Sequence, residues 1–194
     1  MNLIFLRHGE ATDNVKELIS DKEIYWSILT ENGIQTVLES IKELPNKIDK
    51  MYVSPFPRTI ETAHYVYEKY PNIEVSIDNR IREIYYGKYS HQKNNEEIDN
   101  VRRKQIDGDY FIRFGEFGDN KFDIEMRLCE FLIDVSKNKE ENIIIVSHGS
   151  IISYMKRILD IKTKHIEKGH IEIFNDVSFD NVLKRKDYLE SIKK

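Results

Sequence analysis

The sequence predicts an α/β fold: a three-layer α/β/α sandwich whose mostly parallel central sheet carries helices on both faces. Two short apolar runs, residues 3–6 and 143–146, have no polar residue at alternate positions, which is typical of parallel strands buried on both faces. Weaker strand candidates are residues 51–53 and 73–77 and, at the edges of the sheet, residues 171–174 and 177–182. Helical patterns separate these runs, and this alternation favours the layered architecture.

Four amphipathic segments are predicted to form the helices. The first begins after Thr30, whose hydroxyl suits a helix N-cap. In each segment the apolar residues recur three or four positions apart, so they share one helix face. The four stripes are Ile34, Val37, Leu38 and Ile41; Ile60, Ala63, Val66 and Tyr67; Ile124, Leu128, Phe131, Leu132 and Val135; and Ile151, Ile152, Met155, Ile158 and Leu159.

Residues 85–120 depart from this alternation, because they are polar and aromatic and contain four glycines. We expect a surface excursion that covers a functional site, since long ordered loops in compact domains are often functional. The residues that could line a specificity pocket, or simply pack the excursion onto the body, are Tyr110, Phe111, Arg113 and Phe114.

The composition is that of an ordinary globular protein, with 40% hydrophobic and 33% charged residues among 194. This length favours a single domain over residues 1–194, because domains typically have about 100–200 residues. The net charge of −4 argues against a nucleic-acid partner, which would need a basic surface. Cys129 is the only cysteine, so an internal disulfide and a thiolate metal cluster are excluded.

No segment has the features of a targeting or membrane sequence. The apolar run at residues 3–6 is far too short for a signal peptide, and no later run approaches the roughly 20 apolar residues of a spanning helix. We therefore expect a soluble, cytoplasmic protein without a membrane partner. The sequence leaves the oligomeric state open.

Residues with catalytic potential follow three of the strand candidates: Arg7-His8; Ser54, with Arg58 four positions later; and Ser147-His148-Gly149. Ligands of open parallel sheets bind at the carboxyl ends of the strands, so the two arginines and two histidines are predicted to share one sheet edge. Arginine matches phosphate or carboxylate oxygens, and histidine can be a nucleophile, an acid–base catalyst or a metal ligand. A metal site is disfavoured, because the arginines would repel a divalent cation and no HxxxH pair occurs. An anion site with a histidine nucleophile fits better, and phosphoryl transfer depends on such fixed positive charge.

Five segments occur in one order along the chain: residues 6–14 (LRHGEATDN), 29–35 (LTENGIQ), 54–63 (SPFPRTIETA), 82–87 (REIYYG) and 146–149 (VSHG). Together they resemble the signature of the histidine phosphatase superfamily, in the branch that contains the cofactor-dependent phosphoglycerate mutases. The matches extend from residue 3 to about residue 153. The resemblance implies a phosphoglycerate mutase-like α/β/α sandwich, with the excursion at about 85–120 covering the active site.

The resemblance also implies roles for individual residues. His8 would be the nucleophile that becomes a phosphohistidine, and Glu83 would protonate the leaving oxygen and then activate water. The phosphoryl oxygens would be held by Arg7, Arg58, His148 and Asn14. Gly149 and His91 are further candidates for substrate contacts. His8 must be neutral at its attacking nitrogen, so its other ring nitrogen should donate to a backbone carbonyl. No metal and no cofactor is expected.

The chain departs from the family pattern at a few positions that lie near the expected pocket rim. Ala11 stands where threonine is common, Ser90-His91 replaces a glutamate-glycine pair, and Ser153 replaces an arginine. These changes leave the identity of the substrate open. The remaining histidines have no motif around them and are expected to be structural or exposed: His64, His165 and His170.

The favoured function is a metal-independent phosphatase acting on a small, soluble phosphomonoester. The family's mutases usually carry longer insertions after the acid loop, and this chain is short. The alternative is a cofactor-dependent phosphoglycerate mutase. A phosphoprotein or phosphohistidine phosphatase would need an open pocket, and a non-catalytic phosphate-binding scaffold is disfavoured because every core position holds a chemically competent residue.

Overall fold

The computed structural model describes residues 1–21, 27–162 and 164–193. Within them, five strands form one sheet in the order β3-β2-β4-β1-β5. The strands are β1 (Asn2–Arg7), β2 (Lys50–Val53), β3 (Glu74–Ile77), β4 (Asn142–Ser147) and β5 (Ile171–Phe174). Neighbouring strands are parallel except at the edge, where β5 runs antiparallel to β1. The predicted mostly parallel sheet is confirmed.

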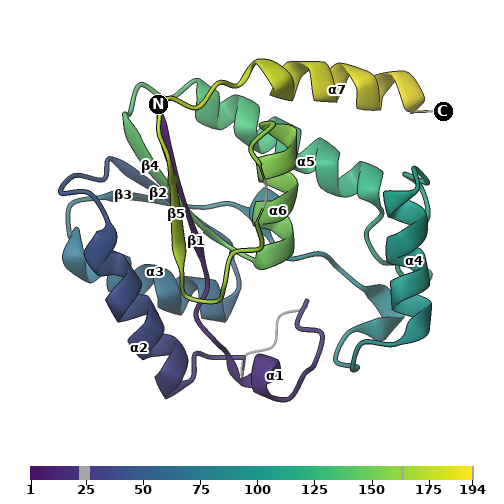
Figure 1. Cartoon of the computed structure of the whole chain (residues 1–194), viewed down its shortest axis with the longest axis horizontal. Helices are drawn as coiled ribbons and strands as arrows, with labels where there is room; N and C mark the ends of the chain where they lie inside the picture. The colour runs from purple at the N-terminus through teal and green to yellow at the C-terminus, as the bar shows by residue number, and fades with distance from the viewer. Residues whose placement is uncertain (22–26, 163, 194) are drawn as a thin grey trace.

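Helices cover both faces of this sheet, which confirms the predicted three-layer sandwich (Figure 1). The helices are α1 (Thr12–Val15), α2 (Glu31–Ser40), α3 (Pro57–Lys69), α4 (Glu96–Ile106), α5 (Lys121–Ser136), α6 (Gly149–Ile158) and α7 (Asp180–Ile192), with single 3₁₀ turns at Ile41–Glu43, Asn79–Ile81 and Gly87–Tyr89. The predicted cap of α2 is present, since the Thr30 hydroxyl accepts a hydrogen bond from the Gly33 N–H at 3.0 Å.

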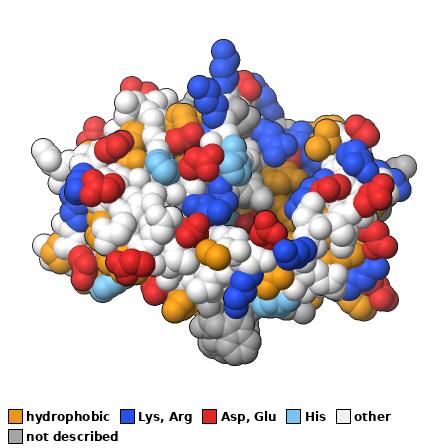
Figure 2. Space-filling view, turned by 60° about the horizontal axis from the view of Figure 1, so that its bottom comes forward, with side chains coloured by type: hydrophobic (Ala, Val, Ile, Leu, Met, Phe, Trp, Pro, Cys, Tyr) orange, Lys and Arg blue, Asp and Glu red, His pale blue; other side chains and the backbone are white. Residues whose placement is uncertain are grey.

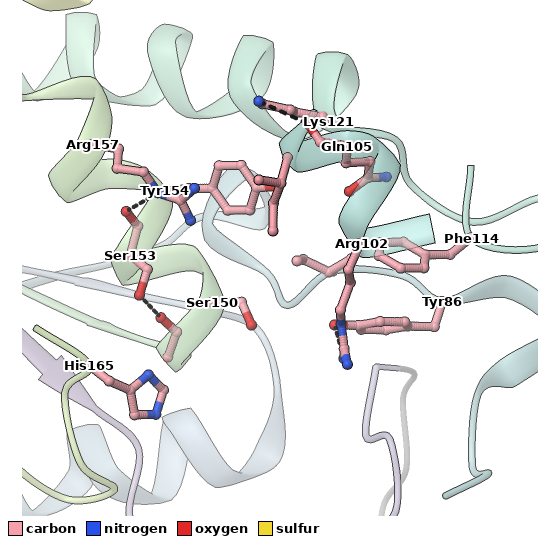
Figure 3. A pocket seen from close by; sticks show the side chains of 13 residues that line it. Tyr86, Arg102, Gln105, Phe114, Lys121, Ser150, Ser153, Tyr154, Arg157 and His165 are labelled. Atoms are coloured by element: carbon pink, nitrogen blue, oxygen red, sulfur yellow. Dashed lines mark hydrogen bonds between the residues drawn. The ribbon is translucent and has the colours of Figure 1, made fainter. Parts of the chain in front are cut away.

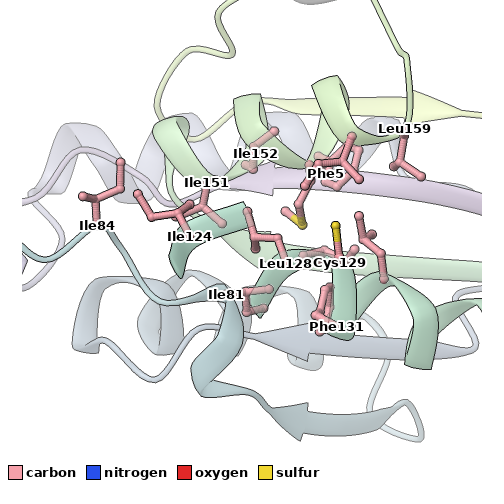
Figure 4. Packing of buried hydrophobic residues seen from close by; sticks show 14 of the residues in the cluster. Phe5, Ile81, Ile84, Ile124, Leu128, Cys129, Phe131, Ile151, Ile152 and Leu159 are labelled. Atoms are coloured by element: carbon pink, nitrogen blue, oxygen red, sulfur yellow. The ribbon is translucent and has the colours of Figure 1, made fainter. Parts of the chain in front are cut away.

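Successive residues of the central strands point alternately into two separate hydrophobic cores, one on each face of the sheet. In β1, Leu3 and Phe5 pack toward α5, α6 and α7, whereas Ile4 and Leu6 pack toward α2 and α3. All four side chains are completely buried. Figure 4 shows the first core, where Phe5 lies among side chains of α5 and α6. Each such side chain contributes roughly 1.5–3 kcal/mol on burial, so the unbroken apolar runs hold both layers on the sheet.

Two expectations about the outer elements are wrong. Residues 177–182 were expected to form an edge strand, but α7 begins at Asp180, and Val182 and Leu189, two turns apart, are buried in the core. A short apolar run does not by itself distinguish strand from helix. In α3, Ile60 and Tyr67 are each 44% exposed, so the buried face is turned toward Ala63 and Val66.

The excursion at residues 85–120 is partly helical, because it contains α4. Asn95 caps this helix, its side-chain oxygen accepting from the Ile98 N–H at 3.1 Å. Ile98 is completely buried, which anchors α4 to the body. None of the helices in the described part of the chain has the length and apolar character needed to cross a lipid bilayer.

Candidate active site

The sheet register places the ends of three neighbouring strands at one edge. Arg7, the last residue of β1, lies opposite Ser147, the last residue of β4, and Val53 at the end of β2 lies opposite Val146. The backbone continues this register, since the His8 N–H donates to the Ser147 carbonyl at 3.0 Å. The residues that follow the three strands therefore converge, as parallel strands require.

His8 is buried and held in one tautomer. Its Nδ1 lies 2.7 Å from the Gly9 carbonyl oxygen, so Nδ1 carries the proton and donates to it. This contact confirms the predicted backbone partner. The other ring nitrogen, Nε2, accepts a hydrogen bond from the Arg58 Nε–H at 3.2 Å. Burial, reinforced by the charge of Arg58, lowers the pKa of His8 well below its ordinary 6.5. The imidazole is neutral at physiological pH, with its lone pair on Nε2.

Arg58 links both histidines to a neighbouring loop. Its Nη1 donates to the Ser20 hydroxyl at 2.9 Å, and its Nη2 donates to the Ser20 carbonyl at 2.8 Å and to His148 Nδ1 at 3.0 Å. Burial lowers the pKa of Arg58 to about 10, so it remains cationic at neutral pH. Five donors in a planar fork let one side chain bind two imidazoles and still match phosphoryl oxygens.

His148 is completely buried next to His8, with the two ring centroids 5.3 Å apart. Because Arg58 donates to its Nδ1, the proton is on Nε2, which lies 2.7 Å from the Ser54 hydroxyl oxygen. Burial, followed by the charge of Arg58, lowers the pKa of His148 well below its ordinary value. Ser54 can also donate, so it can support either tautomer of His148.

Glu83 is the carboxyl group of the site. Its side chain is 16% exposed, and its Oε2 lies 3.9 Å from His148 Nδ1. The other oxygen, Oε1, accepts from the Ile84 N–H at 2.9 Å. Burial raises the pKa of Glu83 above its ordinary 4.5, although the charge of Arg58 opposes the shift. A carboxyl that keeps its proton to higher pH is suited to act as a general acid.

Arg7 completes the cationic cluster from the end of β1. Its Nη1 donates to the Ile166 carbonyl at 2.8 Å and lies 2.8 Å from His165 Nε2. Its Nε is buried and has no hydrogen-bond partner among the described residues. A buried guanidinium N–H of this kind is a suitable donor to an oxygen of an anion.

Gly149 makes room for Arg7 at the start of α6. A Cβ at this position would lie 3.0 Å from both Cζ and Nε of Arg7, tighter than normal contact. The guanidinium therefore lies directly over the N-terminus of a ten-residue helix, where backbone N–H groups add further positive potential.

We expect Gly149→Ala to lower kcat/KM about 10- to 100-fold, because the added methyl group displaces the Arg7 guanidinium by a few tenths of an ångström or more. Steady-state kinetics with p-nitrophenyl phosphate measures the change in kcat/KM. Thermal unfolding separates this local displacement of Arg7 from a general loss of stability. Unchanged kcat/KM would show that Arg7 does not hold the phosphoryl group.

The segment that carries Glu83 is braced by side chains from α5 and its N-terminal loop. Asp119 accepts two hydrogen bonds from the Arg82 guanidinium, at 2.8 and 2.9 Å, and one from the Tyr85 N–H at 3.0 Å. Arg127 is partly buried and donates to the backbone carbonyls of Arg80 and Arg82. These contacts fix the backbone on both sides of the carboxyl group.

The predicted site residues are not all brought together. The structure gathers Arg7, His8, Arg58, Glu83 and His148, with Gly149 against Arg7. The Asn14 side-chain oxygen accepts from the Ala11 N–H at 3.0 Å, which leaves its amide group without a partner among the described residues. His91 is exposed, has a φ of 64° and does not line the cavity beside the site, so the structure offers no support for a substrate contact.

Three further residues contact this cluster, since Ser54, Ser20 and His165 each touch one of its histidines or arginines. Sequence reasoning named Ser54, which follows a strand and begins a motif, without assigning it a role, and it missed the contacts of Ser20 and His165. His165 is exposed, as expected, but it also contacts Arg7. The side chains of His64 and His170 are exposed, and they contact Glu68 and the Lys168 carbonyl, respectively. The His170 backbone carbonyl accepts from the Arg7 N–H at 3.2 Å.

A cavity of about 300 Å³ adjoins the cluster. Seen from the carboxyl ends of the strands, this face of the molecule is hollowed, with basic and histidine side chains near the hollow and apolar ones inside it (Figure 2). Figure 3 shows the lining at close range. The lining residues are Ile84, Tyr86, Arg102, Gln105, Ile106, Phe114, Lys121, Gly149, Ser150, Ser153, Tyr154, Arg157 and His165.

Of the four residues of the excursion considered for this pocket, Phe114 lines it. Tyr110 instead contacts Arg185 and Tyr188, Phe111 stacks on Phe122, and Arg113 pairs with Asp123. Within the described residues, no group of three or more His, Cys, Asp or Glu side chains could hold a metal ion.

A mostly parallel α/β/α sandwich that gathers arginines and histidines at its strand ends has the phosphoglycerate mutase-like architecture. The chain belongs to the histidine phosphatase superfamily (branch 1), whose family model matches residues 3–181. Members of this superfamily are phosphatases or mutases. The resemblance inferred from the five motifs is confirmed.

One curated relative is a 2,3-bisphosphoglycerate-dependent phosphoglycerate mutase from Thermoplasma acidophilum, 35% identical over 106 residues. The match covers 54% of this chain and 52% of that protein, so the chain spans about half the length of this curated relative.

Solved structures of phosphatases share the fold. A mycobacterial glucosyl-3-phosphoglycerate phosphatase with VO3 has a TM-score of 0.73 at 17% identity, over 89% of this chain and 90% of that one. Phosphoserine phosphatase from Entamoeba histolytica, in complex with 3-phosphoglyceric acid, has a TM-score of 0.71 at 24% identity, over 89% of both chains. The α-ribazole phosphatase from Shigella flexneri has a TM-score of 0.71 at 22% identity, also over 89% of both. At these identities the likeness shows the fold.

Proposed function

We propose that this protein is a metal-independent phosphatase that hydrolyses a small, soluble phosphomonoester through a phosphohistidine at His8. The observation that carries the proposal is the neutral, tautomerically fixed His8, whose Nε2 accepts a hydrogen bond from Arg58. Arg58 also binds His148, and Glu83, a carboxyl of raised pKa, lies 3.9 Å from that second imidazole. A non-catalytic phosphate-binding protein has no need of such a nucleophile and acid in one buried cluster.

In the first half-reaction, substrate phosphate displaces the Arg58 Nε–H from His8 Nε2, and Arg58 donates to the phosphoryl oxygens instead. Nε2 attacks phosphorus, the bond from phosphorus to the ester oxygen breaks, and the Glu83 carboxyl gives its proton to that oxygen. The Gly9 carbonyl, which accepts from Nδ1, stabilises the positive charge that develops on the imidazole.

In the second half-reaction, the Glu83 carboxylate takes a proton from water as the water oxygen attacks phosphorus. The bond from phosphorus to Nε2 breaks, inorganic phosphate leaves, and His8 and the protonated Glu83 are restored. Arg7, Arg58 and His148 donate hydrogen bonds to the phosphoryl oxygens throughout, and His148 can do so from Nδ1 if Ser54 donates to its Nε2.

Phosphoglycerate mutase activity is the second candidate, and the Thermoplasma relative favours it. It requires the phosphohistidine to be passed to a second hydroxyl rather than to water. The assay that separates the two measures inorganic phosphate release and, in parallel, conversion of 3-phosphoglycerate to 2-phosphoglycerate in the presence of 2,3-bisphosphoglycerate. We expect phosphate release without isomerisation; isomerisation faster than release would reject the phosphatase.

Hydrolysis of p-nitrophenyl phosphate tests the metal-independent mechanism. We expect the rate to be unchanged by EDTA, and vanadate to inhibit it, because vanadate can occupy the site of the transferring phosphoryl group. Loss of activity on chelation, restored by adding a divalent cation, would reject the mechanism.

The pH dependence of kcat/KM follows from the shifted pKa values of His8 and Glu83. His8 attacks only when neutral, and its lowered pKa keeps it neutral at pH values well below 6.5, so the acidic limb should lie there. Glu83 acts first as an acid, and its raised pKa extends the protonated form above pH 4.5, so activity on an alkyl phosphate should fall as pH rises through that pKa. We therefore expect an acidic optimum for kcat/KM. The substrate phosphate titrates in the same way with wild type and with Glu83→Gln, so it cannot account for a difference between their pH profiles. An alkaline limb that persists unchanged in Glu83→Gln would contradict the assignment of that limb to Glu83.

A further inference from the structure

We propose that the 300 Å³ cavity binds the leaving group of the substrate, and that this leaving group carries a second anionic group, a carboxylate or phosphate, bound at the far end by Lys121 and Arg157. The inference rests on the proposed function, because it takes the phosphoryl group to be bound at His8. It defines the substrate class as phosphomonoesters with a distal anion.

The near end of the cavity is formed by residues tied to the catalytic cluster. Gly149 packs under Arg7, His165 lies 2.8 Å from an Arg7 nitrogen, and the Ile84 N–H binds the Glu83 carboxylate at 2.9 Å. The acid that protonates the leaving oxygen is therefore beside this end of the cavity. A leaving group attached to that oxygen extends into the cavity.

Lys121 and Arg157 mark the opposite end. Both also line a neighbouring depression beside α7, whereas the near-end residues Gly149 and His165 do not. Along α6, Gly149 and Arg157 are eight residues apart, about 12 Å of helix. A helical side chain leans toward the N-terminus of its helix, so the guanidinium can approach the near end. A second anion bound there would lie about 6–12 Å from the phosphorus atom.

These two cations have no carboxylate partner among the described residues. Lys121 Nζ donates to the Gln105 carbonyl at 3.1 Å, and Arg157 Nε donates to the Ser153 carbonyl at 3.3 Å. Glu125, on the same face of α5 as Lys121, attracts both cations electrostatically, but the ion pair that it forms is with Arg185, at 2.6 Å.

Arg102, the third cation of the lining, differs, because it pairs with Asp99 at 3.0 Å. Two cations without a close ion pair at one end of a recess attract an anion, and an anion would also offset their mutual repulsion.

Aromatic rings line the space between the two ends. Tyr86 and Phe114, whose ring centroids are 4.5 Å apart, come from the excursion, and Tyr154 comes from α6 (Figure 3). Arg157 lies over the Tyr154 ring, 4.7 Å from its centroid. These rings suit a carbon skeleton rather than water or a further charge. The cavity thus fits a molecule that is charged at both ends and less polar in the middle.

The test uses ω-carboxyalkyl phosphonates of increasing chain length, which cannot be hydrolysed, with alkyl phosphonates and terminal bisphosphonates of matching length. Affinities are measured by isothermal titration calorimetry. We expect a terminal carboxylate or phosphonate to tighten binding about 10- to 100-fold over the alkyl compound, once the chain reaches the distal cations. The shortest members should show no gain. The stronger of the two end groups identifies the chemistry of the distal anion.

Lys121→Gln with Arg157→Gln should abolish the difference between charged and uncharged end groups. The matched control, Arg103→Gln with Lys104→Gln, removes two exposed charges of α4 outside the cavity and should retain the difference. The inference would be overturned if wild type bound the ligands with a charged end group no more tightly than the alkyl phosphonates. It would also be overturned if the preference for a charged end group survived in the Lys121→Gln, Arg157→Gln double variant. Hydrolysis of p-nitrophenyl phosphate by the same preparation reports the proposed function separately, since that substrate has no distal anion.

Discussion

His8→Ala should lower kcat for p-nitrophenyl phosphate by about 10⁴-fold or more, because no other group can form the covalent intermediate. Among the described residues, the other buried imidazole is His148, and its Nδ1 and Nε2 are already engaged with Arg58 and Ser54. A water molecule activated by Glu83 would have to attack the bound ester directly. Steady-state hydrolysis measured to the sensitivity limit of the assay gives the residual rate.

The variant also leaves the Arg58 Nε–H without an acceptor, at a cost of about 1–3 kcal/mol in stability. Thermal unfolding and circular dichroism show whether the protein remains folded. The matched control is His64→Ala, which removes an exposed histidine that contacts Glu68 and Tyr65 and should leave the rate unchanged. Turnover of folded His8→Ala within about tenfold of wild type would rule out His8 as the nucleophile.

Glu83→Gln should have an effect that depends on the leaving group. For an alkyl phosphate, we expect kcat/KM to fall about 10²- to 10⁴-fold, because the poor leaving oxygen needs a proton as its bond to phosphorus breaks. For p-nitrophenyl phosphate, phosphorylation of His8 needs no proton donor, so kcat/KM should fall by less than about tenfold. Plotting log kcat/KM against the pKa of the leaving group for wild type and variant measures this difference directly.

A second feature of the same variant separates acid from base catalysis. Turnover of p-nitrophenyl phosphate should slow at the hydrolysis of the phosphoenzyme, which produces a burst of nitrophenolate followed by a slow phase. Glu39→Gln, at an exposed glutamate that pairs with Lys42, is the control and should behave like wild type. Equal losses for alkyl and nitrophenyl substrates, without a burst, would contradict the role of Glu83.

The sheet and most of the candidate active-site cluster could be predicted because their signals are local. Residues 3–6 and 143–146 are unbroken apolar runs, and unbroken runs of that length fit strands covered on both faces. The residues next to them then had to lie at one edge, which brings His8 and His148 together. Glu83 could not be found in this way. It follows a 3₁₀ turn rather than a strand, and only the family resemblance singled it out.

The contacts that the sequence did not reveal join distant parts of the chain. Arg58 binds Ser20 across 38 positions, and Arg7 binds His165 across 158. Neither periodicity nor spacing encodes such pairs, because they depend on how complete elements pack. The strand expected at residues 177–182 failed for a related reason. Burial of Val182 and Leu189 against the other helices decides in favour of α7, and a six-residue window does not contain that information.

The formation of a phosphohistidine is tested most directly by trapping it. Glu83→Gln, mixed with an aryl phosphate and quenched with base during the burst, should carry one phosphoryl group per chain, stable to alkali and labile to acid. Peptide mass spectrometry should place it on His8. Steady turnover with no trapped phosphoryl group, or a phosphoryl group on any other residue, would contradict covalent catalysis by His8.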